Sequence, residues 1–137
     1  MEEVLKKFLV VFVILILFFI VRGFNSNSPN QIKADYFDIG YGQSMFEGYN
    51  KVDEKTVQSL VKEYNQIKDI EQTNEEINYD KAVTIHFIYN DQISGSLVID
   101  NKGVFLLGNR SGNFQIDENN DMYEKALKIY KEVKEQN

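Results

Sequence analysis

The sequence predicts an α+β protein with an N-terminal transmembrane helix and a two-layer domain, in which two amphipathic helices cover an antiparallel meander sheet. Three observations favour this architecture. Phe8–Val21 is an uninterrupted apolar run, residues 81 to 117 alternate between apolar and polar side chains with short turns between segments, and two further stretches carry apolar residues at helical spacing. The expected order of elements in the domain is β-β-α-β-β-β-β-α.

The apolar run is the least ordinary feature of the chain. Its 14 residues would cover only about 21 Å as a helix, less than the ~30 Å of a bilayer core. Val4–Phe24, with 21 residues, is long enough if the charges of Lys6, Lys7 and Arg22 extend to the headgroups. The sequence therefore predicts an anchor over residues 1–24 that contacts the lipid bilayer through Val4–Phe24.

Two other interpretations of the run stay open. A cleavable signal peptide has an apolar region of similar length, but cleavage after Ser28 would leave Pro29 as the first mature residue, which signal peptidase tolerates badly. The second of these interpretations is a helix buried in a soluble fold. Lys6 and Lys7 precede the run and Arg22 follows it, so the bias of basic residues predicts a cytoplasmic N-terminus and an extracytoplasmic C-terminal domain.

The segments after the run divide into a linker and a folded domain. Asn25–Asn30 is polar, contains the only proline and predicts a linker, which leaves 31–137 as the domain. Ile32–Ile39 and Ser44–Val52 are predicted strands, separated by a break at Gly40–Gly42.

Both domain helices have recognisable starts. Asp53 is the expected N-cap of a helix that runs to about Ile70, and Glu71–Asn78 is predicted to be an exposed loop. Asp121 followed by Glu124 predicts the start of the last helix. The four meander strands between the two helices are expected at Lys81–Tyr89, Ser94–Ile99, Val104–Leu107 and Asn113–Asp117.

Composition excludes several classes of function. The chain has no cysteine, so disulfides and thiolate chemistry are ruled out. Beyond Arg22 there are 12 basic and 19 acidic residues, and a domain this acidic repels nucleic-acid phosphates. Nucleic acid is therefore not expected as a partner.

No motif predicts a catalytic, cofactor-binding or metal site. His86 is the only histidine, and its neighbours along the same strand face, Thr84 and Ile88, do not titrate. Asp117–Asp121 resembles the start of a calcium loop, but Met122 replaces the required glycine and Lys128 the closing glutamate. No glycine-rich phosphate loop is present.

Aromatic residues are concentrated just after the linker. Most are expected to pack in the core or on the sheet, but aromatic side chains are also enriched at the centres of protein interfaces. This stretch is therefore the predicted partner surface. Its candidate residues are Tyr36, Tyr41, Phe46 and Tyr49.

As a whole, the chain resembles small membrane-anchored or exported α+β domains of low-GC Gram-positive bacteria. The resemblance is carried by the apolar run Phe8–Val21, the meander VTIHFIYNDQISGSLVIDNKGVFLLGN and the closing helix MYEKALKIYKEV. It implies an extracytoplasmic location and provides no functional residues.

The expected function is a membrane-tethered extracytoplasmic binding or accessory protein, either immunity-like or part of an envelope assembly, with an unidentified protein partner in the envelope. The alternative is an exported inhibitor or effector released by signal cleavage. An enzyme is not expected, and a carboxylate-dependent hydrolase is the least favoured possibility because the acidic residues suggest no defined pair.

Overall fold

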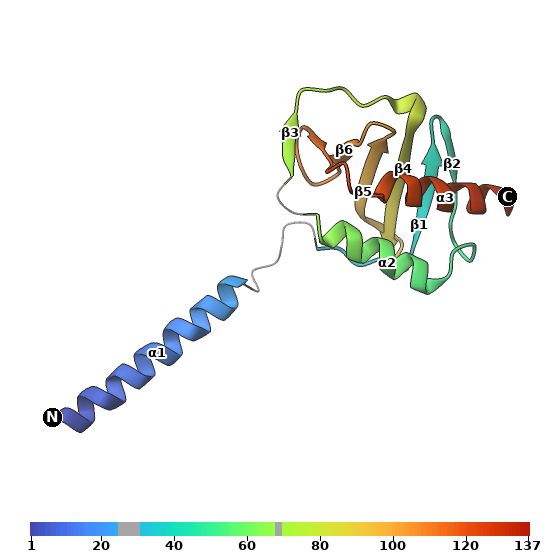
Figure 1. Cartoon of the computed structure of the whole chain (residues 1–137). Helices are drawn as coiled ribbons and strands as arrows, with labels where there is room; N and C mark the ends of the chain where they lie inside the picture. The colour runs from blue at the N-terminus through green and yellow to red at the C-terminus, as the bar shows by residue number, and fades with distance from the viewer. Residues whose placement is uncertain (25–30, 68–69) are drawn as a thin grey trace.

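The computed structural model describes residues 1–24, 31–67 and 70–137, and within the first helix it describes the side chains of residues 1–7 and 9–14. Over these residues the protein is α+β, with three α-helices, one short 3-10 helix at Tyr79–Lys81 and one antiparallel sheet (Figure 1). The α-helices are α1 (Glu2–Phe24), α2 (Glu54–Asn65) and α3 (Met122–Glu135). The strands are β1 (Tyr36–Tyr41), β2 (Ser44–Phe46), β3 (Glu71–Thr73), β4 (Ala82–Tyr89), β5 (Gln92–Asp100), β6 (Val104–Leu107) and β7 (Asn113–Gln115).

The apolar side chains of helix α1 that the structure describes are exposed. Those described from Val4 to Ile14 are between 48% and 70% exposed. Within the described part of the chain, no helix combines the length and the apolar character that crossing a bilayer requires. The transmembrane helix predicted at Val4–Phe24 is thus not found among the described residues. The side chains of Phe8 and of residues 15–24 lie outside the described part of the chain, and so does the predicted linker 25–30.

The sheet has seven strands in the order β2-β1-β4-β5-β6-β7-β3, and every neighbouring pair is antiparallel. The meander from β4 to β7 follows the predicted order. One prediction is wrong in part, because Glu71–Thr73 forms strand β3 at the sheet edge and pairs with β7. A polar segment of three residues has no alternation of apolar and polar side chains, so its sequence does not identify it as a strand. It is extended because it pairs with β7, where Gln72 lies opposite Phe114.

The first predicted strand begins later than expected. Ile32 is held by the side chain of Asn65 in α2, whose Oδ1 accepts from the Ile32 amide at 2.7 Å and whose Nδ2 donates to its carbonyl at 3.0 Å. Gln58 Nε2 similarly donates to the Ala34 carbonyl at 3.1 Å. These bonds attach the incoming segment to α2, so β1 starts only at Tyr36.

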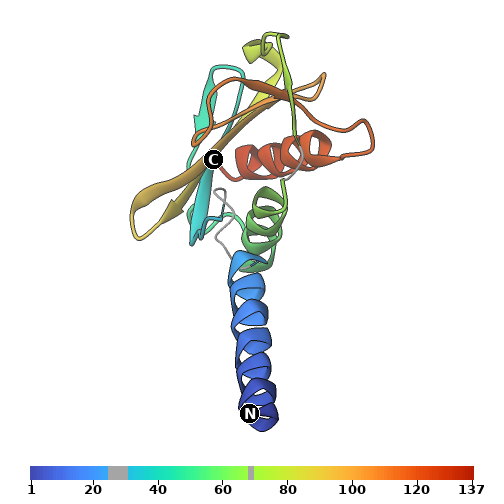
Figure 2. The same ribbon diagram turned by 90° about the vertical axis from the view of Figure 1, so that its left-hand side faces the viewer.

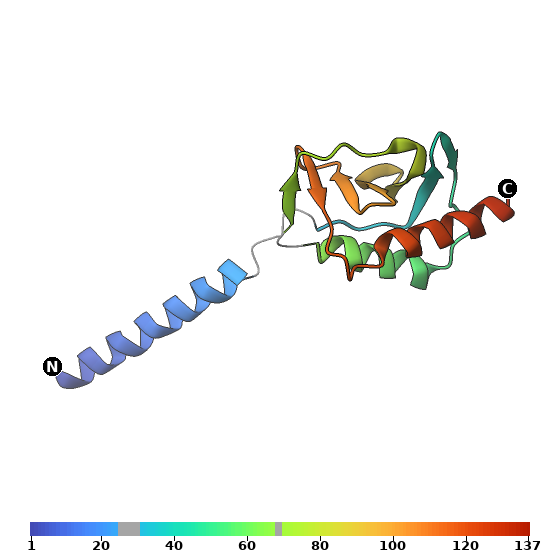
Figure 3. The same ribbon diagram turned by 45° about the horizontal axis from the view of Figure 1, so that its top comes forward.

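The core lies between the helices and one face of the sheet. Figures 2 and 3 show α2 and α3 side by side on that face. Phe37, Ile85 and Phe87 are at most 1% exposed and belong to one cluster with the apolar stripes of both helices. The cluster also contains residues from β5, β6 and β7, so the two predicted amphipathic helices and the predicted meander bury their apolar faces together.

The opposite face of the sheet carries a second, smaller group of buried residues. Ile77, on the segment between β3 and β4, packs with Ala82 and Val104 in a second small cluster. Beside it lies Asp100, the one fully buried charged residue among the described ones. Its carboxylate accepts three backbone N–H groups: Oδ1 from Lys102 at 2.9 Å and Val104 at 3.0 Å, and Oδ2 from Asn78 at 3.0 Å. Asp100 thus joins the β5–β6 turn to the covering segment.

We expect Asp100→Asn to lower the free energy of unfolding by about 1–3 kcal/mol, because an amide presents an NH₂ group to at least one backbone donor and leaves it unpaired. Urea denaturation measures the change. Asp91→Asn, at an exposed turn where Asn tolerates the positive φ of 60°, is the matched control and should be close to wild type. Equal stabilities for the two variants would contradict the structural role of Asp100.

Candidate binding surface

Tyr36 and Tyr49 form an aromatic pair on the side of β1 that faces away from the helices. Phe37 points into the core, and because side chains alternate along a strand, Tyr36 points to the opposite face. The rings of Tyr36 and Tyr49 meet edge to face, with centroids 5.3 Å apart and an interplanar angle of 72°. Tyr49 remains 55% exposed. The pair therefore offers ring surface to a partner.

The loop that carries Tyr49 is fixed to β1 through Gly48. A Cβ at Gly48 would lie 2.0 Å from the Phe37 carbonyl oxygen, so only glycine permits this approach. The Gly48 amide donates to Asp38 Oδ1 at 3.4 Å, and Asn50 turns the chain with a φ of 58°. These contacts place Tyr49 over Tyr36.

A pocket of about 330 Å³ lies beside this pair, at the junction of the segment before β1, the Tyr49 loop and the start of α2. We call it the tyrosine pocket. Its charged residues are both acidic: Asp35 and Glu54. Asp35 Oδ2 accepts from the Asn90 amide at 3.0 Å, which fixes that carboxylate at the rim. The lining residues are Ala34, Asp35, Tyr36, Tyr49, Asn50, Val52, Glu54 and Gln58.

The charges that act on Tyr36 are all negative. Desolvation raises the pKa of its hydroxyl, and the carboxylates of Asp38, Asp91 and Glu47 raise the pKa further. The hydroxyl therefore stays protonated and neutral at physiological pH. The same carboxylates make the surroundings of the aromatic pair favourable to a cation.

The structure divides the predicted partner surface into two parts. Tyr41 and Phe46 lie on the helix side of the sheet, where their rings are 5.7 and 5.8 Å from that of Tyr130 in α3. Tyr36 and Tyr41 are five positions apart on one strand, so they face opposite sides. Tyr41 and Phe46 thus attach α3 to the sheet, and Tyr36 and Tyr49 are the members that form a separate surface.

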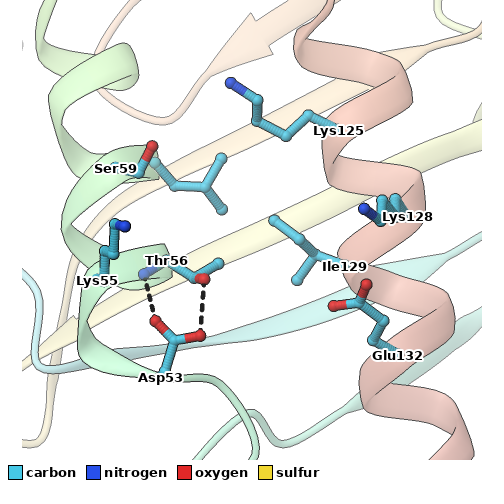
Figure 4. A pocket seen from close by; sticks show the side chains of 9 residues that line it. Asp53, Lys55, Thr56, Ser59, Lys125, Lys128, Ile129 and Glu132 are labelled. Carbon is cyan, nitrogen blue, oxygen red and sulfur yellow. Dashed lines mark hydrogen bonds between the residues drawn. The ribbon is translucent and has the colours of Figure 1, made fainter.

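A second hollow, of about 370 Å³, lies between α2 and α3 (Figure 4). Leu60 and Ile129 are its buried apolar residues, and Lys55, Lys125 and Lys128 stand among its polar ones. Asp53 and Glu132 also line it, and Lys125 forms an ion pair with Glu63. Because both signs of charge are present, this groove does not select a ligand of one sign. The lining residues are Asp53, Lys55, Thr56, Ser59, Leu60, Lys125, Lys128, Ile129 and Glu132.

His86 has polar neighbours that its own strand does not reveal. Strand register places Asp38 of β1 directly opposite it on one side and Ser96 of β5 on the other. An Asp-His-Ser relay requires the imidazole to bond both neighbours, one through each nitrogen. In the described structure, His86 Nδ1 is buried and has no hydrogen-bond partner. The three residues are adjacent but do not form a relay.

The acidic segment before α3 acts as a turn and a helix cap. Asp117 Oδ1 accepts from the Asn119 amide at 2.9 Å, and Asn120 Oδ1 accepts from the Met122 amide at 2.9 Å. Asp121 occupies the N-cap position, as predicted, but its side chain makes no capping bond. Over the described ranges, no group of three or more His, Cys, Asp or Glu residues is arranged to hold a metal ion.

Comparison with protein families, with curated proteins and with solved structures finds no match to this chain. The fold defines the class, an α+β domain whose described residues form a seven-stranded antiparallel sheet.

Asp53 provides a test of the structure at the start of α2. Its Oδ1 accepts from the Thr56 amide at 2.8 Å and its Oδ2 from the Thr56 hydroxyl at 3.0 Å, and these bonds lower the pKa of the carboxyl (Figure 4). A lowered folded-state pKa means that the stabilisation is complete above the unfolded value of about 3.9 and is lost as the pH falls through the folded value.

We therefore expect Asp53→Ala to lower the urea midpoint near neutral pH, with a smaller gap to wild type at a pH below the folded-state pKa. Asp53→Asn keeps a capping oxygen without a titrating group and is the control. Its advantage over the alanine variant should persist at both pH values. A gap between wild type and Asp53→Ala that does not change with pH would contradict the role of the charged cap.

Proposed function

We propose that this protein is a membrane-tethered, extracytoplasmic binding or accessory module, held in the bilayer by Val4–Phe24, whose domain 31–137 contacts a protein partner in the envelope. The observation that supports this proposal is the exposure of the apolar side chains described in α1, each at least 48% accessible. Such side chains are favoured in a nonpolar medium, at about 25 cal/mol per Å² of apolar surface removed from water.

The composition of the whole apolar run also favours a lipid environment. The run Phe8–Val21 has no polar side chain, and Lys6, Lys7 and Arg22 lie at its two ends, where headgroups would receive their charges. The larger number of basic residues before the run favours an N-terminus in the cytoplasm.

A binding role for the domain rests on the tyrosine pocket. Binding sites are concave and combine apolar or aromatic walls with a few placed polar groups. Tyr36 and Tyr49 provide aromatic walls here, and Asp35 and Glu54 provide the charge. The pocket is the one hollow described above whose charged lining residues share a single sign.

The membrane tether is tested by expressing the full chain with a C-terminal epitope in a bacterial host. We expect the chain to pellet with membranes and to resist carbonate extraction. Protease added to spheroplasts should digest the C-terminal domain. The double variant Val11→Asp/Ile14→Asp should shift the chain out of the membrane fraction, since each aspartate near the centre of a span costs about 3 kcal/mol.

The matched control places the same two charges on exposed apolar residues of the domain, as Met45→Asp/Ile93→Asp, where they should leave the membrane fraction unchanged. Mass spectrometry of the N-terminus separates the alternatives. An intact Met1 in the membrane fraction agrees with a tether, whereas a shortened chain in the medium would identify the exported inhibitor or effector. Full-length chain in the supernatant after ultracentrifugation would overturn the proposal.

A further inference from the structure

We propose that the tyrosine pocket is a receptor for an arginine side chain carried by a polypeptide partner. The inference deepens the proposed function, since it assigns the chemistry by which the domain would recognise its partner. It rests on three features: a hollow of suitable size, an aromatic pair in its wall of which Tyr49 is exposed, and lining residues whose charges are all negative.

The aromatic pair is built to receive a planar cation. Because the rings of Tyr36 and Tyr49 meet edge to face, the ring faces are not stacked against each other. The loop contacts of Gly48 hold Tyr49 in place although it is 55% exposed. A guanidinium stacks on such a face and is attracted by the negative potential of the ring.

Carboxylates surround the pair at several positions. Asp35 and Glu54 line the pocket, and Asp38, Glu47 and Asp91 are near enough to act on the Tyr36 hydroxyl. The pocket lining contains no Lys, Arg or His, so no cation of the described chain occupies it.

Three lysines are next to lining residues in the sequence, and their described contacts lie outside the pocket lining. Lys33 Nζ lies 5.8 Å from the centroid of the Tyr89 ring, and Lys55 lines the groove between α2 and α3. Lys51 belongs to the same loop as Tyr49, but its ammonium donates to the side-chain oxygen of Asn137 at the end of the chain. The Lys51 carbonyl likewise accepts from Gln136 Nε2 at 3.1 Å. The ammonium of Lys51 therefore does not neutralise the carboxylates that line the pocket.

Three points favour a peptide-borne arginine over other cations. A guanidinium can bond a carboxylate through two parallel N–H groups while its plane lies on a ring, which the ammonium of lysine cannot do. A hard metal ion requires several oxygen ligands, and no group of three or more acidic residues or histidines is arranged for one among the described residues. Free arginine would bring its own carboxylate towards Asp35 and Glu54, whereas an arginine within a peptide has none.

The test uses the full chain in nonionic detergent micelles, labelled with ¹⁵N, and the blocked peptide acetyl-Gly-Arg-Gly-amide as the probe. We expect saturable amide shifts centred on Tyr36, Tyr49 and Glu54. The same peptide with citrulline, a neutral isostere of arginine, should bind about tenfold more weakly because it keeps the shape and loses the charge. Free arginine should also bind more weakly than the blocked peptide.

Two variants assign the binding to the pocket. Tyr49→Ala removes the exposed ring and Glu54→Gln removes a rim charge without changing its shape, and each should weaken binding about two- to fivefold. The matched controls, Tyr79→Ala and Asp80→Asn, change an exposed tyrosine and an exposed acid outside the pocket and should bind as wild type. Amide spectra of each variant confirm that the domain is folded.

Absence of saturable shifts would overturn the proposal, as would equal binding of the citrulline peptide or unchanged binding by Tyr49→Ala. None of these results depends on where the chain resides in a cell. Failure of the arginine pocket is therefore distinguishable from failure of the membrane tether, which is measured by fractionation.

Discussion

The burial of Phe37 on β1, against the helices, is the constraint on which the rest of the structure depends. Its ring meets that of Phe87 on the paired position of β4, with centroids 6.2 Å apart, and Phe87 in turn contacts Tyr64 of α2 at 5.2 Å. These two contacts join two strands and a helix. Because side chains alternate along β1, the position of Phe37 also sends Tyr36 to the outer face and Tyr41 towards α3. The core and the candidate site are two faces of the same strand.

Local patterns were sufficient to predict the meander and the two domain helices. The alternation from Val83 to Tyr89 and the helical spacing of Val57, Leu60 and Val61 are properties of short windows of sequence, and the structure contains both elements. The elements that were missed depend on distant partners. Strand β3 forms because its backbone pairs with β7. Ile32 lies outside β1 because its amide donates to the side chain of Asn65, 33 positions away.

In the candidate site, too, some features follow from the local sequence and others depend on distant contacts. Sequence proximity brought Tyr36, Tyr41, Phe46 and Tyr49 into one predicted surface, and the predicted strand ended at Ile39. Had the strand been extended through Gly40 to Tyr41, alternation alone would have separated Tyr36 from Tyr41. The position of Tyr49 over Tyr36 could not be predicted from strand alternation, because it depends on the close approach of Gly48 to the Phe37 carbonyl. Asp38 and Ser96 beside His86 were likewise visible only through strand register.

Charge connects the proposed membrane tether with the proposed arginine pocket. Beyond Arg22 the acidic residues outnumber the basic ones by seven, so anionic headgroups repel the domain even while a tether would keep it near them. A surface that carries Tyr36, Tyr49 and a rim of carboxylates therefore has little tendency to lie on lipid, although tyrosine alone is common at membrane interfaces. The same negative potential attracts a basic segment of a protein and increases its rate of encounter. Under the two proposals, the apolar run would determine location, and the acidic rim of the tyrosine pocket would determine which class of partner is selected.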